Sequence, residues 1–595
     1  MVSSSHLGRT HLVDRCRDLA QLRGEQLAFT WLDDGEREAN HLSFAQLDHR
    51  ALHIAAALAA RGLSGERALL AYAPGLEFIA AFLGCLYAGV IAVPISTPRD
   101  ELAAQNVLGI ARDATPYVLL TDRLTRERGA RWISQLGPIE VLLSESLDTP
   151  APCVWRPASV DPRAVAFLQY TSGSTSAPKG VEVTHANMVA NARMIRAAFE
   201  QDERTVLASW LPLYHDMGLI GAVLQALFLG VRCVLMAPSA FIQHPVRWLR
   251  AISRYGATTS GGPDFGYRLC LQRVRDEELA QLDLSSWNVA FNGAEPVRAD
   301  TLERFTERFA SVGFRRTSFY PCFGLAEATL FVSGGDARAS YVTLDVDSEA
   351  LELGLAQPVT PQSPNAHRLV GCGRAWLDGR LRIVDPSSRE ECADDVVGEI
   401  CVAGPHVARG YRNRPTEHDD PFRTFLACGA GPFLRTGDLG FVSRGELFVT
   451  GRLKDLLIHN GRNYYPQDIE WAAGLAHEGL RSEGTVAFLA DERAQSEERL
   501  VVVQEVHERL ASILARDDEA SRALQAEVSG AVRHAVVRRV GLAVWKVVLI
   551  EPRGQPRTTS GKVQRGLTRT LWRQGALPEL GRTAIVAAAD GEHRS

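Results

Sequence analysis

The most informative stretch of this chain is Tyr170-Thr-Ser-Gly-Ser-Thr-Ser-Ala-Pro-Lys-Gly180. It follows an apolar run at 164–169, which is a predicted buried strand, and it precedes a predicted helix at 185–199. In such a strand-to-helix loop, hydroxyls, backbone N–H groups and a lysine ammonium can bind phosphate oxygens. The loop does not fit the Walker A pattern, so it predicts a phosphate site of another kind; a polar surface loop is the alternative.

Strand-like and helix-like segments alternate on both sides of this loop. Ser43 is predicted to cap a helix that ends at Gly62, and a helix at 76–88 is expected between strands at 68–72 and 90–93. This alternation predicts parallel sheets with helices on both faces. Further predicted strands lie at 117–120, 141–143 and 231–236.

The character of the sequence changes twice more. From about Leu381, short strands separated by glycines and acidic turns predict a smaller β-rich subdomain. After the boundary region at Gly451 to Lys454, β-like runs and a long polar helix indicate a separate α+β domain. We therefore predict an α/β fold. An N-terminal domain, 1–453, holds two parallel αβαβ sheet subdomains and the β-rich subdomain, and a small C-terminal domain covers 454–595.

The length and composition of the chain exclude several classes of protein. A chain of 595 residues is too long for one core, and its net charge of −5 does not favour nucleic acid as a partner. The ten cysteines are scattered without a CxxC pair, so neither a zinc site nor a disulfide framework is expected. The longest apolar stretch, 78–95, contains two glycines and a proline, so we expect a buried helix and strand instead of a transmembrane segment. A cytoplasmic enzyme is the expectation.

The TSGSTSAPKGV loop resembles the phosphate loop of the adenylate-forming superfamily, which includes acyl-CoA synthetases, luciferases and peptide-synthetase adenylation domains. Segments similar to the other motifs of that superfamily follow in order and extend the match over nearly the whole chain. The resemblance implies ATP and Mg²⁺ as cofactors, with the ATP and acyl pocket in the N-terminal domain. These segments lie at 211–218, 292–296, 320–327, 435–438, 451–455 and 558–562.

The resemblance also implies individual roles. Glu327 would bind Mg²⁺, Lys454 would be the hinge of a mobile C-terminal domain, and Lys562 would reach the acyl carboxylate and the α-phosphate. The implied catalytic residues are Lys179, His215, Glu327 and Lys562. The implied nucleotide-binding residues are Thr171, Ser172, Gly173, Ser174, Thr175, Gly293, Ala294, Glu295, Phe323, Gly324, Asp438 and Arg452.

Some of these positions have more specific implied roles. Phe323 would stack on adenine, Asp438 would accept hydrogen bonds from the ribose, and Arg452 would contact the ribose or the α-phosphate. Phe323 and Ala326 depart from the tyrosine or tryptophan and the threonine common in the superfamily. A hydroxyl hydrogen bond is thereby lost.

Four segments, among them SWLPLYHDMGLIG and GRLKDLLIHNGRNYYPQDIE, resemble the fatty acyl-AMP ligases. The stretch between Glu327 and Gly371 is long enough for the insertion of that branch, expected within Val342 to Arg368, although a variable surface loop is the alternative. The implied reaction turns a long-chain fatty acid and ATP into acyl-adenylate and pyrophosphate. The acyl group would then pass to the phosphopantetheine of a separate acyl carrier protein.

Three alternatives stay open: a long-chain fatty acyl-CoA synthetase, a non-catalytic lipid or nucleotide binding module, and an aminoacyl-adenylating enzyme. The acyl pocket is expected to be an apolar tunnel in the large domain. Gly261 and Gly262 would let the backbone approach the acyl chain there. Trp210, Phe241 and Phe265 are its candidate lining, although ordinary core packing explains them equally well.

Overall fold

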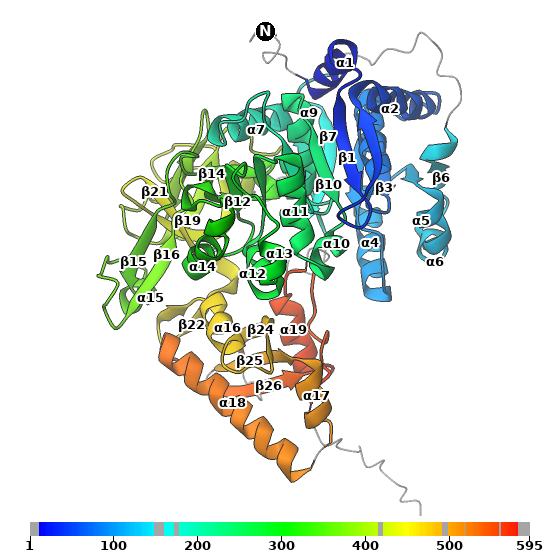
Figure 1. Ribbon diagram of the computed structural model, residues 1–595. Coiled ribbons are helices and arrows are strands. Elements are labelled where there is room, and N and C mark those ends of the chain that lie inside the picture. Colours follow the sequence, from blue (N-terminus) through cyan, green and yellow to red (C-terminus); the bar gives the residue numbers. More distant parts are fainter. Residues whose placement is uncertain are drawn as a thin grey trace, which may run out of the picture. The chain divides into compact units, whose positions relative to one another are not determined.

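The computed structural model describes residues 11–147, 160–171, 178–414, 421–490, 498–516, 518–558 and 561–580. The chain divides into two compact units, Met1–Leu453 and Lys454–Ser595. The division lies inside the Gly451-Arg-Leu-Lys-Asp455 motif. Both units contain helices and strands, and the first holds the two large sheets (Figure 1).

A six-stranded sheet carries the phosphate-loop stretch. Its strand order is β6-β5-β3-β4-β7-β8, and all neighbours are parallel except β7 and β8. Its strands are β3 (Arg67–Ala71), β4 (Ile91–Ile95), β5 (Val118–Thr121), β6 (Glu140–Leu143), β7 (Val165–Thr171) and β8 (Lys179–Thr184). Helices that precede or connect these strands are α2 (Phe44–Ala59), α3 (Leu76–Ala88), α4 (Glu101–Ala114), α5 (Arg123–Arg128) and α6 (Ala130–Ile133).

The sequence signals for these elements are local. The Ser43 side chain accepts a hydrogen bond from the Gln46 backbone N–H, as the predicted helix cap requires. Most of α3 is buried, which explains why its sequence is apolar on every side. Gly89 ends α3 with a φ of 65°, a left-handed conformation that glycine adopts without strain.

The strand-to-helix prediction for the phosphate loop is wrong. The loop joins β7 to the antiparallel strand β8, and helix α7 (His185–Ala198) begins only after β8. β8 forms because Val181 and Val183 are fully buried, and β-branched side chains at alternate positions favour a strand. The Thr184 side chain then accepts a hydrogen bond from the Asn187 backbone N–H and starts α7.

A nine-stranded sheet forms the second layer of the first unit, in the order β17-β14-β13-β12-β11-β9-β10-β1-β2. The six strands from β13 to β1 are parallel, and antiparallel strands close both edges. The strands are β1 (Leu27–Leu32), β2 (Glu38–Ser43), β9 (Leu207–Ser209), β10 (Cys233–Met236), β11 (Thr259–Gly262), β12 (Val289–Asn292), β13 (Phe319–Gly324), β14 (Phe331–Gly334) and β17 (Arg374–Ala375).

These two sheets confirm the predicted α/β fold with parallel strands. Because the carboxyl ends of parallel strands meet at one edge, the loops that follow β9, β11, β12 and β13 lie at the same edge of the sheet. Helices associated with this sheet are α1 (Leu12–Leu22), α8 (Asp216–Gly218), α9 (Gln225–Leu229), α10 (Pro238–Gln243), α11 (Val246–Tyr255), α12 (Asp264–Arg273), α13 (Asp276–Leu279) and α14 (Ala299–Phe309).

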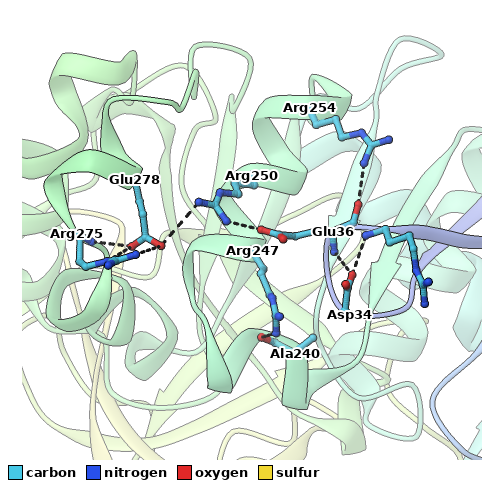
Figure 2. A network of polar contacts seen from close by, with 9 residues as sticks. Asp34, Glu36, Ala240, Arg247, Arg250, Arg254, Arg275 and Glu278 are labelled. Atoms are coloured by element: carbon cyan, nitrogen blue, oxygen red, sulfur yellow. Dashed lines mark hydrogen bonds and ion pairs between the residues drawn. The ribbon is translucent and has the colours of Figure 1, made fainter.

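Ion pairs attach the β1–β2 turn to helix α11 (Figure 2). The Arg250 guanidinium binds the Glu36 carboxylate and lies 3.8 Å from Glu278, and Arg254 donates to the Glu36 carbonyl at 2.7 Å. The Asp34 carboxylate accepts the backbone N–H groups of residues 36 and 37 and shapes the turn. Each exposed pair of this kind contributes little to the free energy of unfolding. We interpret the network as one that fixes the position of the turn against α11.

The rest of the first unit is antiparallel. A four-stranded sheet, β18-β19-β20-β21, forms the predicted β-rich subdomain. The segment predicted to hold the insertion folds as two paired strands with a short helix between them. The elements are β15 (Thr343–Asp347), α15 (Ser348–Glu352), β16 (Ala366–Val370), β18 (Arg380–Val384), β19 (Gly398–Ala403), β20 (Leu434–Ser443) and β21 (Glu446–Arg452).

The second unit is an α+β structure. Its three-stranded sheet has the order β24-β25-β26, with one antiparallel and one parallel pairing. The elements are β22 (Leu457–His459), β23 (Arg462–Tyr464), α16 (Pro466–Gly474), β24 (Leu480–Ala490), β25 (Arg499–Val506), α17 (Glu508–Leu514), α18 (Glu519–Val540), β26 (Val544–Ile550) and α19 (Arg565–Arg573). Within the described parts of both units, every helix is too short or too polar to cross a bilayer.

Two buried histidines should make the stability of the first unit sensitive to acid. His185 and His406 are 2% and 0% exposed, and burial lowers the pKa of each from 6.5 to about 4. Between those values the unfolded chain binds protons that the folded chain does not, so stability falls as the pH falls. Each histidine should remove about 2 kcal/mol of unfolding free energy between pH 7 and pH 5.

Urea denaturation of His406→Gln at the two pH values tests this. The loss of stability from pH 7 to pH 5 should be smaller than in the unchanged chain by about 2 kcal/mol. His244→Gln, at an exposed position, is the control and should keep the original pH dependence. An equal loss in His406→Gln and in the unchanged chain would contradict the assignment.

Candidate active site

The loop after β12 is the predicted adenine-binding turn, and two close contacts shape it. Ala294 has a φ of 68°, which is uncommon for a residue with a side chain. A Cβ at Gly293 would lie 2.7 Å from the Cys322 carbonyl oxygen, so only glycine allows the turn to approach β13 this closely. The Glu295 carboxylate accepts the Phe265 backbone N–H at 2.6 Å and thereby fixes the far side of the turn.

A tight turn after β13 presents Glu327. Gly324 is required at its start, because a Cβ there would lie 2.0 Å from the Leu330 carbonyl oxygen. The Leu325 backbone N–H donates to the same oxygen at 2.9 Å. Phe323, at the end of β13, is 8% exposed, so little of its ring is open to solvent. Glu327 therefore projects from a short 3-10 turn, Ala326–Ala328, that backbone hydrogen bonds hold directly after β13.

The structure brings Lys179 and Glu327 together through a residue that sequence analysis did not identify. The Tyr411 hydroxyl donates to Glu327 Oε1 at 2.7 Å, and Lys179 Nζ lies 5.0 Å from the centre of the Tyr411 ring. Burial, and then the Glu327 carboxylate, raise the pKa of Tyr411 far above its ordinary value, so its hydroxyl keeps its proton and acts as the donor.

Tyr411 reaches this position because its backbone pairs with β8. It forms a β-bridge with Val181, the Glu182 N–H donates to the Gly410 carbonyl, and the Arg412 N–H donates to the Gly180 carbonyl. Gly410 and Tyr411 lie between β19 and β20 of the β-rich subdomain. Their local sequence does not predict the contacts of Tyr411 with Lys179 and Glu327. Only the long-range pairing with β8 reveals them.

The residues of the TGD and hinge motifs in the first unit are paired with each other. Asp438 on β20 and Arg452 on β21 are register partners, and Arg452 Nε donates to Asp438 Oδ1 at 2.9 Å. The Asp438 side chain is 8% exposed and that of Arg452 is 53% exposed. This pair presents an acceptor and a cation side by side, as contacts to ribose and phosphate require.

His215 caps the short helix α8 at the carboxyl end of β9. Its Nδ1 lies 2.5 Å from Asp216 Oδ1, and the Met217 backbone N–H donates to the same carboxylate oxygen at 2.7 Å. His215 thus lies at the same edge of the nine-stranded sheet as Gly293 and Glu327, and the neighbouring carboxylate orients its ring.

The described residues include the two ends of the predicted phosphate loop. Thr171 is the last residue of β7 and pairs with Lys179 on β8. Ser172, Gly173, Ser174 and Thr175 lie outside the described residues. The two ends of the loop are therefore paired in register, and Lys179 at one end lies beside the Tyr411 ring.

In the second unit, Lys562 lies on a tight turn. The Thr558 backbone N–H donates to the Lys562 carbonyl at 2.7 Å, and the Lys562 backbone N–H donates to Thr558 Oγ1 at 3.1 Å. Three residues later, Arg565 binds Glu470 and lies 3.0 Å from Asp455, which directly follows Lys454. The helix that follows the Lys562 turn and the start of this unit are thus joined by one partly buried guanidinium.

Two of the three aromatic residues proposed for an acyl pocket are core residues in this structure, and the third, Phe265, is partly buried against them. Trp210 and Phe241 are 2% and 0% exposed, and their rings stack with centroids 4.0 Å apart. A Cβ at Gly262 would lie 2.7 Å from the Trp210 ring, and one at Gly261 would lie 2.1 Å from the Phe291 carbonyl. The space beside both glycines is filled by protein, which favours the core-packing interpretation.

The donor set at Glu327 suits Mg²⁺. Mg²⁺ in nucleotide enzymes commonly takes one or two carboxylates, with phosphate and water oxygens completing its coordination. Among the described residues, no group of three or more histidine, cysteine or acidic side chains forms a separate metal site. A single carboxylate that Tyr411 links to Lys179, at one end of the phosphate loop, fits an ion bound together with a nucleotide.

Known proteins resemble this chain over most of its length. The profile of the family described as AMP-binding enzyme matches residues 17–412. Medium-chain-fatty-acid--[acyl-carrier-protein] ligase JamA of Moorena producens is 41% identical over 96% of each chain. Long-chain-fatty-acid--AMP ligase FadD26 of Mycobacterium marinum is 37% identical over 92% of this chain and 95% of its own.

A solved structure extends the agreement to the fold. The fatty acyl-adenylate ligase from L. pneumophila, in complex with acyl adenylate and pyrophosphate, superimposes with a TM-score of 0.74. It is 38% identical and covers 97% of this chain and 98% of its own.

Proposed function

Because this chain belongs to the AMP-binding enzymes, and within them to the fatty acyl-AMP ligases, we propose that it activates a fatty acid as acyl-adenylate and transfers the acyl group to an acyl carrier protein. ATP is the second substrate, and pyrophosphate is released. The observation that carries the proposal is the contact of Tyr411 with both Glu327 and Lys179, the lysine that closes a hydroxyl-rich loop.

The chemistry explains why these charges are needed. A fatty-acid carboxylate attacks the α-phosphorus of ATP, and both reactants are anionic. The site must therefore neutralise charge and hold the reacting atoms in line. We assign Lys179 and the loop hydroxyls to the β- and γ-phosphates, and Asp438 with Arg452 to the ribose and α-phosphate. His215 is assigned to the acyl side of the reaction centre.

Two more groups complete the proposed site. Glu327 would hold Mg²⁺, which supplies Lewis-acid stabilisation of the phosphate oxygens when bound. Lys562 lies on the second unit, and we assign it to the acyl carboxylate and the α-phosphate. This role requires the second unit to bring Lys562 to the nucleotide, with Lys454 as the hinge.

The carrier protein is proposed as the acceptor because relatives named as acyl-carrier-protein ligases align over nearly the whole chain. The names of relatives include both medium-chain and long-chain fatty acids, so the acyl length stays a prediction. We also propose a cytoplasmic location. All cysteines in the described segments are free thiols, as a reducing compartment predicts.

Incubation with ATP, Mg²⁺ and fatty acids of graded length tests the function. We expect acyl-adenylate and pyrophosphate without any thiol, and loss of acyl-adenylate when a phosphopantetheine-bearing carrier protein is added. Mass spectrometry of the carrier should then show the acyl group. Rapid release of acyl-CoA on addition of CoA would favour the synthetase alternative, and absence of pyrophosphate with every acid would exclude the proposed reaction.

A further inference from the structure

Tyr411 contacts two residues of the proposed site from one side chain. We propose that Tyr411 is a positioning residue, which holds the Glu327 carboxylate and the Lys179 ammonium in register for one metal-bound triphosphate. This inference rests on the proposed function and adds a residue that none of the sequence motifs assigns. Its hydroxyl acts on Glu327 and its ring acts on Lys179, so the two effects can be separated by substitution.

Tyr411 is itself rigidly held, as a positioning residue must be. The backbone of the segment 409–412 hydrogen-bonds to β8 on both sides of Tyr411. The ring of Phe422 meets the Tyr411 ring edge-on with centroids 5.0 Å apart. With its backbone and ring both fixed, the phenol has little freedom to follow Glu327, and Glu327 adopts the orientation that the phenol sets.

The segment 408–411 contacts Glu327 at two points. The Ala408 backbone N–H donates to the Glu327 carbonyl at 2.9 Å, and the Tyr411 hydroxyl occupies carboxylate oxygen Oε1. Among the residues that the structure describes, none donates to the other oxygen, Oε2. One oxygen is thus anchored and the other is available to a cation, the arrangement by which outer hydrogen bonds orient a metal ligand.

The ring of Tyr411 provides a platform for Lys179. Lys179 Nζ lies 5.0 Å from the ring centre, within the range of an attractive cation–π contact. Lys179 stands at the first position of β8, directly opposite Thr171 at the start of the phosphate loop. The ring therefore keeps the Lys179 ammonium at the end of the loop. The same Tyr411 side chain orients the Glu327 carboxylate.

The chain contains a matched control far from these motifs. Tyr255 donates its hydroxyl to Glu38 Oε1 at 2.5 Å, and the Arg232 guanidinium lies 4.9 Å from its ring centre. The same three groups, a carboxylate, a phenol and a cation, therefore occur at the edge of the nine-stranded sheet. Tyr255→Phe deletes an equivalent hydrogen bond without touching the proposed site.

The test uses the full chain and measures binding as well as turnover. Mn²⁺ binding in the presence of ATP is followed by electron paramagnetic resonance, and ATP binding without metal is followed by calorimetry. Tyr411→Phe should weaken Mn²⁺ binding about tenfold and leave metal-free ATP binding unchanged. Tyr411→Leu should weaken both, because it also removes the platform of Lys179. Tyr255→Phe should change neither.

The outcomes separate this inference from the proposed function. Wild-type Mn²⁺ affinity in Tyr411→Phe, or an equal loss in Tyr255→Phe, would overturn the positioning role. If the unchanged chain binds Mn²⁺ and ATP but forms no acyl-adenylate, the proposed reaction fails. The binding comparison would still decide the role of Tyr411.

Discussion

Lys562→Ala should lower the rate of acyl-adenylate formation about a hundredfold, equivalent to ~3 kcal/mol of lost transition-state stabilisation. Negative charge gathers on the α-phosphate as the carboxylate attacks, and Lys562 is the residue proposed to meet it. The side chain is exposed on its own unit, so its truncation should not disturb folding. Single-turnover formation of acyl-adenylate measures the rate, and calorimetry should show ATP binding close to that of the unchanged chain.

The composition of the chain provides the control for this substitution. The sequence contains four lysines, Lys179, Lys454, Lys546 and Lys562, among 65 basic residues. Lys546 belongs to the same unit as Lys562 and lies 5.9 Å from the centre of the Trp572 ring, outside every motif. Lys546→Ala should retain the original rate. If Lys562→Ala formed acyl-adenylate as fast as Lys546→Ala, Lys562 would have no part in the chemistry.

Glu327→Gln should also reduce acyl-adenylate formation by roughly a hundredfold. The amide has the shape of the carboxylate and can still accept the Tyr411 hydroxyl, but it lacks the charge that a bound Mg²⁺ requires. The turn that presents residue 327 should stay intact, because Gly324 and the Ala408 N–H shape it through the backbone. The rate should be measured as a function of Mg²⁺ concentration.

Glu38→Gln is the matched control, since Glu38 also accepts a tyrosine hydroxyl. It should show the Mg²⁺ dependence of the unchanged chain. A Glu327→Gln variant that reached the original rate at the original Mg²⁺ concentration would show that Glu327 does not hold the metal. Because Tyr411→Phe keeps the charge at position 327, its effect should be the smaller of the two.

The small number of lysines is itself informative about the site. Where arginine supplies nearly all the positive charge, three of four lysines fall in the phosphate-loop, hinge and C-terminal motifs. A lysine offers a compact charge on a flexible stem, whereas arginine offers a planar fork. Lys179 and Lys562, the two positions proposed to place a mobile point charge beside phosphate, are thus lysines in an arginine-rich chain.

The sequence by itself determined the parts of this protein that depend on local chemistry. Ser43 marked a helix start, the apolar run of α3 marked a buried helix, and alternating strands and helices indicated parallel sheets. The order of the motifs along the chain likewise predicted the family. These signals are readable because capping, periodicity and glycine turns act over a few neighbouring residues.

Only the tertiary structure decided which distant residues meet. It replaced the expected strand-to-helix loop by the β7–β8 hairpin, and it put Tyr411 between Lys179 and Glu327. It also joined Arg565 to Asp455, beside the proposed hinge. Apart from the local β7–β8 hairpin, these contacts join residues that are 84, 110 and 232 positions apart in the chain (411 − 327, 565 − 455 and 411 − 179). Local sequence patterns carry no information about such pairings, because their free energy arises only once the sheets have assembled.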